Sequence, residues 1–268
     1  MFDKVLIANR GEIAVRINRA CQELGISTVA IHSEADADSM HVRIADESVC
    51  IGPNPVNKSY LNAHAIISAC EITGAQAVHP GYGFLSENAS FAKMLDDHKL
   101  TFIGPKHKHI SMMGDKIEAK KIMQEYGVPT VPGSKGAVAD LKDALKTSKD
   151  IGFPVLLKAS AGGGGRGMKV VNDEKELTDA LPIIKQEALS FFGNDSIYIE
   201  KFIDSPRHIE IQVICDSHDN FLHLHERDCS VQRRNQKVIE EALAPEIDQT
   251  KKDKLFKICI DAMEKMGY

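Results

Sequence analysis

A run of glycines between two apolar segments carries the clearest chemical signal in this sequence. Five of the six positions from 162 to 167 are glycine: Gly162, Gly163, Gly164, Gly165 and Gly167. Each glycine in a regular element costs roughly 0.5–1 kcal/mol relative to alanine, so a tight hairpin alone would not require this composition. Glycine-rich turns let main-chain N–H groups point at an anion, because no Cβ atom stands in the way. We therefore predict a phosphate-binding flap, and the plainer alternative is a flexible linker.

Two lysines precede this flap in the chain. Lys158 ends the apolar segment that enters it, and Lys116 begins an expected helix further upstream. An ammonium about 4 Å from a phosphate charge contributes roughly 4 kcal/mol at an effective dielectric near 20. Two such lysines facing one nucleotide would neutralise charge that develops during phosphoryl transfer. Alone, each would be an ordinary surface lysine, and only the arrangement around the flap favours nucleotide binding.

Other nucleotide and metal motifs are weaker or missing. The P-loop pattern G-x-x-x-x-G-K-[ST] has no match, and residues 9–12 after the first expected strand do not give G-x-G-x-x-G. A dinucleotide-dependent dehydrogenase is therefore disfavoured. A zinc site at His223, His225 and Cys229 is also disfavoured, because their spacing matches no common zinc site.

The elements that must position these residues follow from the hydrophobic periodicity. In the first hundred residues short apolar runs alternate with amphipathic helical patterns, which predicts a parallel, doubly wound sheet. The expected strands there are Lys4–Ala8, Ser27–His32, Gln76–His79 and Thr101–Ile103, and the expected helices are Gly11–Leu24, Leu61–Thr73 and Ser86–Asp97, the last capped by Ser86.

The pattern changes after an expected helix at Lys116–Tyr126, where residues 130–134 have the turn chemistry of a domain boundary. Helices are then expected at Asp140–Ile151, at Asp173–Phe192 with a kink at Pro182, and at Asp248–Gly267. The expected strands are Pro154–Ser160 and Met168–Val171, followed by three antiparallel strands at Ile197–Phe202, His208–Cys215 and Asn220–His225. We thus predict an α/β domain at residues 1–113 and an α+β region at 114–268.

Composition excludes several classes of protein. Hydrophobic residues make up 43% and charged residues 26%, as in an ordinary globular enzyme. The formal net charge of −5 argues against nucleic acid as a partner. No apolar run approaches 18 residues and the N-terminus lacks a signal-peptide pattern, so we expect no membrane segment. The six cysteines contain no C-x-x-C pair, so we expect reduced thiols and a cytoplasmic location.

Longer motifs then occur in order along the whole chain. They are VLIANRGEIA at 5–14, HPGYGFLSEN at 79–88, KAS with the flap at 158–167, EKF at 200–202, RHIEIQ at 207–212 and ERDCSVQRRNQK at 226–237. This set resembles the biotin carboxylases, a family of biotin-dependent ATP-grasp ligases. The resemblance implies an N-terminal α/β domain, an ATP-grasp α+β lid at about residues 131–202, and the beginning of a C-terminal ATP-grasp region.

The same resemblance implies a role for particular residues. ATP phosphates would be bound by Lys116 and Lys158, with Gly164 and Gly165 lying over them. Lys237 would be the catalytic residue that faces the bicarbonate and biotin site, where a cation can hold a carboxylate-like anion. The remaining implied contacts are Glu200, Lys201, Phe202 and Ile203 around adenine, with main-chain groups of that strand reading the base; His208 near the ribose or phosphates; Asn235, often histidine in relatives, near the nucleotide; and Glu87, Glu210 and Gln232 in second rank.

The implied reaction has two steps. ATP phosphorylates bicarbonate to carboxyphosphate, and the released CO₂ then carboxylates a ureido nitrogen of biotin. Implied partners are a biotin carboxyl carrier protein and carboxyltransferase subunits, and the expected form is a homodimeric subunit of acetyl-CoA carboxylase in fatty-acid synthesis. Relatives carry their acidic Mg²⁺ ligands beyond the position of Tyr268, so we expect Mg²⁺ as a cofactor, no metal ligands within these 268 residues, and slow ATP turnover by the chain alone.

Three alternatives remain open from the sequence. The first is the biotin carboxylase part of a propionyl-CoA or pyruvate carboxylase. The second is carbamoyl-phosphate synthesis, which shares the phosphorylation of bicarbonate, although residues 79–88 and 232–237 favour biotin. The third is a nucleotide-binding fragment without catalytic activity.

Overall fold

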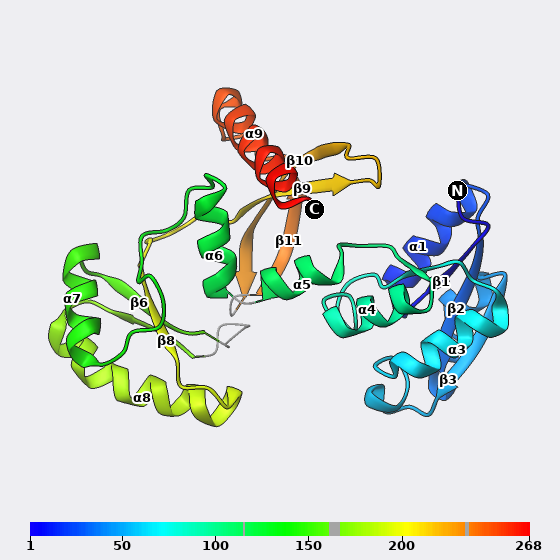
Figure 1. The fold of residues 1–268 in the computed structure, drawn as a ribbon, viewed down its shortest axis with the longest axis horizontal. Coiled ribbons are helices and arrows are strands. Elements are labelled where there is room, and N and C mark those ends of the chain that lie inside the picture. The colour runs from blue at the N-terminus through cyan, green and yellow to red at the C-terminus, as the bar shows by residue number, and fades with distance from the viewer. Residues whose placement is uncertain (115, 161–166, 234–235) are drawn as a thin grey trace. The chain divides into compact units, whose positions relative to one another are not determined.

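The chain folds into two compact units, residues 1–114 and 115–268, and each is described by itself (Figure 1). The structure is a computed structural model that describes residues 1–114, 116–160, 167–233 and 236–268, without the side chains of residues 116 and 117. A parallel α/β unit is followed by an α+β unit, as the sequence predicts.

The first unit is built on a five-stranded parallel sheet in the order β3-β2-β1-β4-β5. The chain moves outward from β1 in one direction and then returns to continue from β1 on the other side, so the sheet is doubly wound as expected. Its strands are β1 (Lys4–Ile7), β2 (Ser27–Ser33), β3 (Glu47–Gly52), β4 (Ala77–His79) and β5 (Thr101–Phe102). Its helices are α1 (Gly11–Glu23), α2 (Met40–Ile44), α3 (Ala63–Thr73), α4 (Ala89–Asp97) and α5 (His107–Gly114), with short 3₁₀ turns η1 (Glu34–Asp36) and η2 (Val56–Lys58).

Hydrophobic side chains are buried on both faces of this sheet. Leu6 of β1 belongs to one core cluster, while its neighbours Val5 and Ile7 belong to another. Successive strand residues point to opposite faces, and helices cover both faces of a doubly wound sheet. The uninterrupted apolar run of β1 in the sequence therefore follows from its central place.

Two expectations about the first unit need correction. Helix α4 begins at Ala89, and its N-cap is Asn88, whose side chain accepts a hydrogen bond from the N–H of Phe91, so the predicted cap at Ser86 is wrong. Strand β3 was not expected, because its sequence does not alternate between apolar and polar residues and only Ile51 is buried. Its pairing with β2 makes it a strand.

The second unit contains a three-stranded antiparallel sheet in the order β7-β6-β8. These strands are β6 (Val155–Ala159), β7 (Met168–Val171) and β8 (Ile197–Lys201), and the helices α7 (Leu141–Ile151) and α8 (Glu174–Phe192) pack against them. Leu157, Leu177 and Ile199 are fully buried in the core between these layers. Helix α8 runs through Pro182 without interruption, and whether this proline bends it stays a prediction.

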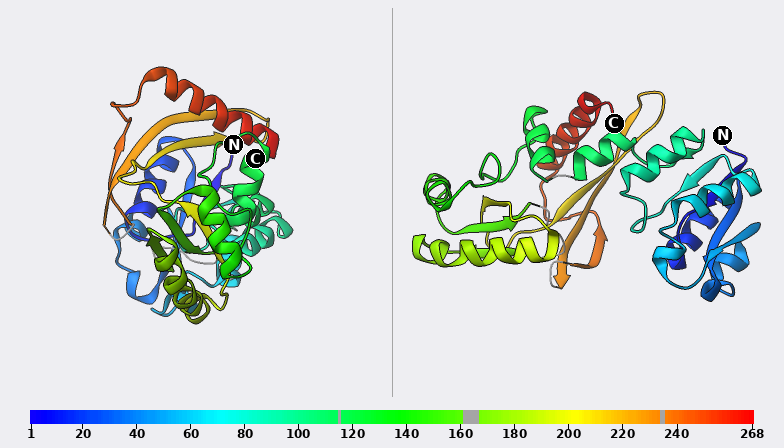
Figure 2. Two further views of the ribbon diagram at one scale, coloured as in Figure 1. Left: turned by 90° about the vertical axis from the view of Figure 1, so that its left-hand side faces the viewer. Right: turned by 60° about the horizontal axis from the view of Figure 1, so that its bottom comes forward.

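A second antiparallel sheet has the order β11-β10-β9, and helix α9 lies along it (Figure 2). Its elements are β9 (Ile209–Cys215), β10 (Phe221–Arg233), β11 (Gln236–Ala242) and α9 (Gln249–Met266), while α6 (Lys116–Glu125) precedes both sheets in the chain. The expectation that β8 forms an antiparallel set with the next two strands is wrong, because β8 pairs with β6 instead. Strand β10 was expected to end at His225 but extends eight residues further, and β11 was not expected.

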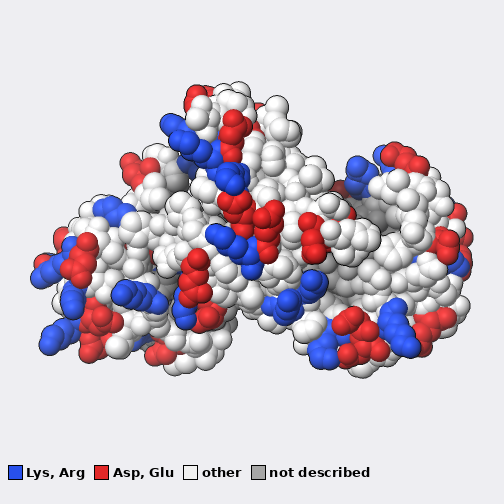
Figure 3. Space-filling view, turned by 45° about the horizontal axis from the view of Figure 1, so that its top comes forward, with Lys and Arg blue, Asp and Glu red and all other residues white. Residues whose placement is uncertain are grey.

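Charged side chains of both signs are interspersed on the face shown in Figure 3. Among the residues that the structure describes, this face shows no large patch of one charge sign. A large positive patch is what would attract the phosphates of a nucleic acid. None of the described helices combines the length and the apolar character that crossing a membrane requires.

Candidate active site

Lys158, Glu200 and Lys120 form an ion-pair cluster on the sheet of the second unit; we call it the Glu200 cluster. Lys158 lies opposite Tyr198 in the register of β6 and β8, so Glu200 is its diagonal neighbour on the same face. The Nζ atom of Lys158 is 2.6 Å from Oε2 of Glu200, and Nζ of Lys120, from α6, is 3.0 Å from Oε1. Two ammonium groups thus share one carboxylate.

The electrostatics of this cluster suit an anionic ligand. The Glu200 side chain is only 13% exposed. Burial alone would raise the pKa of Glu200, but hydrogen bonds from Lys158 and Lys120 outweigh it and hold the pKa below its ordinary value. The carboxylate is therefore ionised at neutral pH, and the cluster carries one positive charge in excess. Lys158 also lies 5.9 Å above the ring centroid of Tyr198, which further orders its ammonium.

The next residues of this segment, 201 to 203, were expected to surround adenine. The ammonium of Lys201 donates instead to the main-chain oxygens of Gly152 and Phe153, at 2.9 and 3.0 Å. The main-chain N–H groups of Lys201 and Phe202 donate to Pro132 and Pro154, respectively. These two N–H groups are therefore not free to donate hydrogen bonds to a base, since both already donate within the protein. Ile203 follows with an exposed side chain.

A second cluster, the Glu210 cluster, consists of Glu210, Arg227 and Lys237 on three neighbouring strands. Glu210 of β9 pairs in register with Arg227 of β10, whose Nε donates to Oε1 at 2.6 Å. Lys237 of β11 donates to the other oxygen, Oε2. Burial would raise the pKa of Glu210, but the hydrogen bonds from Lys237 and Arg227 outweigh it and lower the pKa.

Lys237, the residue expected to be catalytic, is a cation in this arrangement. Its hydrogen bond to Glu210 raises its pKa above the ordinary value. Protonated at neutral pH, it has no lone pair with which to accept a proton. It can hold an anion, which is the role that the sequence predicts for it.

His208 and Gln232 lie beside the Glu210 cluster. Nε2 of Gln232 is 3.0 Å from Nδ1 of His208, and Nε2 of His208 is 3.9 Å from Oε2 of Glu210. A cavity of about 380 Å³ is lined by Pro206, Arg207, His208, Ile209, Ser230 and Gln232. The structure therefore brings together four expected site residues: His208, Glu210, Gln232 and Lys237.

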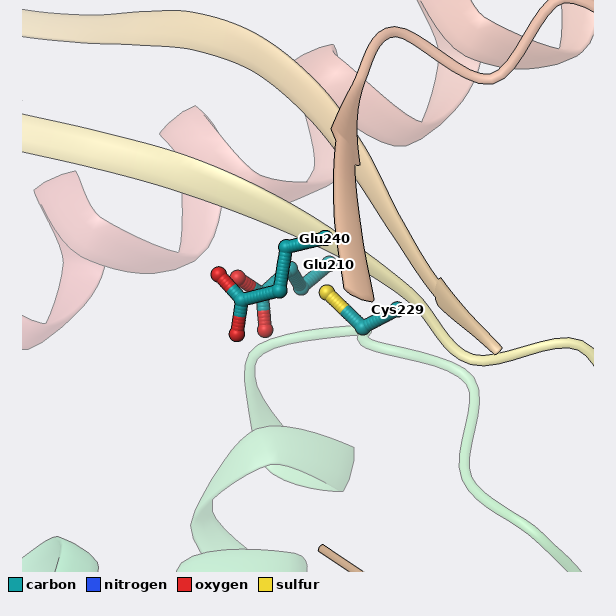
Figure 4. A group of neighbouring side chains, drawn as sticks. All are labelled: Glu210, Cys229 and Glu240. Atoms are coloured by element: carbon teal, nitrogen blue, oxygen red, sulfur yellow. The ribbon is translucent and has the colours of Figure 1, made fainter. Parts of the chain in front are cut away.

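The group of acidic and thiol side chains that converges in the second unit does not fit a magnesium ion. Among the described residues, Glu210, Cys229 and Glu240 are the group whose possible ligand atoms all lie within 4.8 Å of one another, and Figure 4 shows their side chains converging. Glu210 is already neutralised by Lys237 and Arg227, and burial raises the pKa of the Cys229 thiol. Mg²⁺ prefers an octahedral set of oxygen ligands, so a neutral thiol and a paired carboxylate are unsuitable.

The two histidines considered as zinc ligands, His223 and His225, pack against an aromatic ring instead. His223 stacks on Phe256 of α9 with ring centroids 4.0 Å apart, and His225 meets the same ring edge-on at 5.7 Å. Cys229 converges instead with the two glutamates of Figure 4. The histidines thus contribute to the packing of α9 on β10.

Several expected site residues lie outside the described part of the chain. They are Gly164, Gly165, Asn235 and the side chain of Lys116. Glu87 is exposed and belongs to the first unit. The roles expected of all five stay predictions.

Sequence reasoning missed Lys120 and Arg227. Lys120 follows Lys116 by four residues on one helix, and this spacing places both lysines on the same helical face. Arg227 stands opposite Glu210 only because of the strand register. The first residue could have been found from its spacing, whereas the second requires the pairing of β9 with β10.

Two family models match the chain, one for each unit. "Biotin carboxylase, N-terminal domain" matches residues 1–110, and "Carbamoyl-phosphate synthase L chain, ATP binding domain" matches residues 115–268. Biotin carboxylase of Pseudomonas aeruginosa is 55% identical over 269 residues, which cover 100% of this chain and 60% of that protein. The mitochondrial propionyl-CoA carboxylase alpha chain of Rattus norvegicus is 58% identical over 241 residues, covering 90% of this chain and 33% of the relative.

Solved structures agree with these matches. A biotin carboxylase complex with β,γ-ATP from Campylobacter jejuni has a TM-score of 0.93 and 49% identity, covering all of this chain and 60% of that one. The biotin carboxylase domain dimer of 2-oxoglutarate carboxylase from Hydrogenobacter thermophilus, with MgADP, ADP and bicarbonate, has a TM-score of 0.91 and 48% identity, covering 100% and 59%.

The fold and the site thus define an ATP-grasp protein. Within that class, the chain belongs to the biotin carboxylase family, as its motifs predict. The chain spans about 60% of the length of the Pseudomonas aeruginosa relative.

Proposed function

We propose that this chain supplies the nucleotide-binding part of an ATP-dependent biotin carboxylase. The observation that carries the proposal is the Glu200 cluster, in which Lys158 lies at the entrance of the glycine run with an excess positive charge around it. The segment before the run contacts its last residue, because the N–H of Ala159 donates to the oxygen of Gly167 at 2.8 Å. A loop closed at its base beside a cation is suited to cover phosphates.

The chemistry proposed for the whole enzyme is phosphoryl transfer followed by carboxylation. A bicarbonate oxygen attacks the γ-phosphorus of ATP, the bond to ADP breaks, and carboxyphosphate forms. Carboxyphosphate then releases phosphate and CO₂, and the ureido nitrogen of biotin attacks CO₂ and loses its proton to the released phosphate. Lys158 would bind phosphate oxygens, and the protonated Lys237 would hold bicarbonate. Mg²⁺ would supply charge neutralisation, with ligands other than the described residues.

The remaining site assignments are part of this proposal. Residues of about 131–202 would act as the lid, with Gly164 and Gly165 over the phosphates and Lys116 beneath them. Asn235 and His208 would lie near the nucleotide. Because the N–H groups of residues 201 and 202 already donate within the protein, adenine would contact Ile203 or the main-chain oxygens of this segment.

We further propose a place in fatty-acid synthesis, as the biotin carboxylase component of acetyl-CoA carboxylase. A biotin carboxyl carrier protein and carboxyltransferase subunits would be its partners, and it would act as a dimer. The relatives named "Biotin carboxylase" and the dimeric neighbour support this assignment. Six cysteines without a disulfide support a cytoplasmic location. The 58% identity to a propionyl-CoA carboxylase chain supports a second candidate, in which propionyl-CoA receives the carboxyl group.

Calorimetric titration of the chain with ADP tests the proposal. We expect ADP to bind more tightly than GDP, and Lys158→Met to weaken ADP binding by roughly tenfold or more, because a charged hydrogen bond to phosphate is lost. Lys175→Met removes an exposed lysine of α8 and serves as the control. The proposal fails if the wild-type chain does not bind ADP at millimolar concentration, or if Lys158→Met and Lys175→Met bind ADP with the same affinity.

A further inference from the structure

Lys120 reaches Glu200 through a space that only glycine leaves open. Gly133 forms an isolated antiparallel bridge with Glu200, so its backbone lies directly against β8. A Cβ atom at position 133 would stand 2.6 Å from the main-chain oxygen of Ile199 and 2.9 Å from Nζ of Lys120. The absence of a side chain at this position therefore lets the ammonium of α6 enter the cluster.

The carboxylate of Glu200 has both oxygens occupied, each by a different lysine. Lys158 is bound to Oε2 and Lys120 to Oε1, and all three side chains are at most one-quarter exposed. If Lys158 turns towards an incoming phosphate, it leaves its place on Glu200. Without Lys120 this movement would strand a nearly buried carboxylate, which is costly.

We propose that Lys120 is a positioning residue that keeps Glu200 neutralised while Lys158 passes from Glu200 to the phosphate of the nucleotide. This inference rests on the proposed function, in which Lys158 binds ATP phosphates. Lys120 itself does not touch the nucleotide. It lowers the cost of releasing Lys158, and its effect on affinity therefore passes entirely through the carboxylate of Glu200.

A double-mutant cycle on the chain tests this coupling, with ADP as the ligand in calorimetric titration. Lys120→Met should weaken ADP binding by roughly tenfold, the effect of leaving one partner of a nearly buried pair without compensation. In the Glu200→Gln background no carboxylate remains to be stranded. The further change Lys120→Met should then alter ADP affinity by less than about twofold.

Lys121→Met is the matched control, since Lys121 is the next residue of the same helix, carries the same charge and is exposed. It should bind ADP as the wild type does. An equal loss of ADP affinity in Lys120→Met and Lys121→Met would mean that the overall positive charge of the helix, and not the contact with Glu200, governs binding. A tenfold loss of affinity from Lys120→Met in both backgrounds would mean that Lys120 contacts the nucleotide. Either result overturns the proposal, as does an unchanged affinity of Lys120→Met.

The test remains decisive if one variant folds poorly or if the wild type does not bind ADP. Should Lys120→Met fold poorly, Glu200→Gln and its double variant can still be compared, because neither leaves the carboxylate of Glu200 unpaired, and a tenfold difference between these two variants would overturn the proposal. Failure of the wild-type chain to bind ADP would remove the proposed function and this inference together. ADP binding by the wild type with no coupling in the cycle would remove the inference alone.

Discussion

Lys252→Met removes the cation that neutralises Glu226, a carboxylate whose side chain is 3% exposed. Oε1 of Glu226 accepts hydrogen bonds from Nζ of Lys252 at 2.6 Å and from the N–H of Ala244 at 2.9 Å. Its Oε2 is buried and has no partner among the described residues. Burial would raise the pKa of Glu226, but these two hydrogen bonds lower it to about 2. The pair fastens α9 and Ala244 to β10, the strand that carries Arg227.

The expected loss of stability follows from two independent estimates. Removing one partner of a buried ion pair costs about 3–5 kcal/mol. The variant can escape by protonating Glu226; at about pH 7.5 this costs roughly 4 kcal/mol, because the ordinary pKa lies about three units lower. At about pH 5.5 the same escape costs roughly 1.4 kcal/mol. We therefore expect a loss of about 3–4 kcal/mol at the higher pH and about 1 kcal/mol at the lower.

The sign of the pH dependence separates the two proteins. In the wild type the depressed pKa of Glu226 contributes stability above its ordinary pKa, and this contribution is lost as the pH falls towards 2. In Lys252→Met the burial of Glu226 is no longer offset by the lysine, so its pKa rises above the ordinary value. The destabilisation of the variant must then grow as the pH rises.

Amide hydrogen exchange followed by mass spectrometry measures this loss in peptides from β10 and α9. A local measurement is needed because the chain has two compact units, and one melting temperature would not isolate the second unit. Lys251→Met changes the adjacent exposed lysine and should have little effect, whereas Glu226→Gln combined with Lys252→Met should recover most of the loss. A loss below about 0.5 kcal/mol, or one equal at both pH values, would refute the reasoning.

Two further predictions concern the first unit and are measured by exchange of its β1 and β4 amides. Asn9→Ala removes an amide that donates to the main-chain oxygens of residues 80 and 82, both at 2.8 Å, and should lower the free energy of unfolding by about 2 kcal/mol. The exposed control Asn54→Ala should lower it by less than about 0.5 kcal/mol, and equal effects of the two variants would contradict this prediction. Asp36→Asn removes a carboxylate whose pKa is held well below its ordinary range by hydrogen bonds from Arg10. The stability of the wild type should therefore fall as the pH drops below that ordinary pKa, and the variant should lose this dependence. A variant with the same pH profile as the wild type would contradict the prediction.

The candidate site divides according to how far its residues lie apart in the chain. Lys158 and the glycine run are neighbours, and their types alone indicate phosphate binding. Lys120 and Glu200 are 80 residues apart, and their ion pair exists only because residues around Gly133 run against β8. No local pattern in the sequence records such a contact.

Strands show the same division. Strand β6 and helix α1 follow closely from the sequence, because β6 alternates buried and half-buried residues and α1 buries a single face. Strand β11 has every residue exposed, so no apolar alternation marks it, and β10 continues to Arg233 because it has β9 and β11 as partners. Pairing energy, which depends on residues elsewhere in the chain, determines these two strands.

The sequence alone determined the family and the order of the two units and predicted a nucleotide as the ligand, because long motifs and hydrophobic periodicity are local properties of the chain. The tertiary structure decided the charges of the site. It placed Lys120 on Glu200 and set Arg227 and Lys237 on Glu210, a contact that raises the pKa of Lys237 and so favours the cationic form that the sequence already implied. It also turned the ammonium of Lys201 to the main chain. The ionisation state of a side chain depends on its burial and on neighbours that only folding brings near.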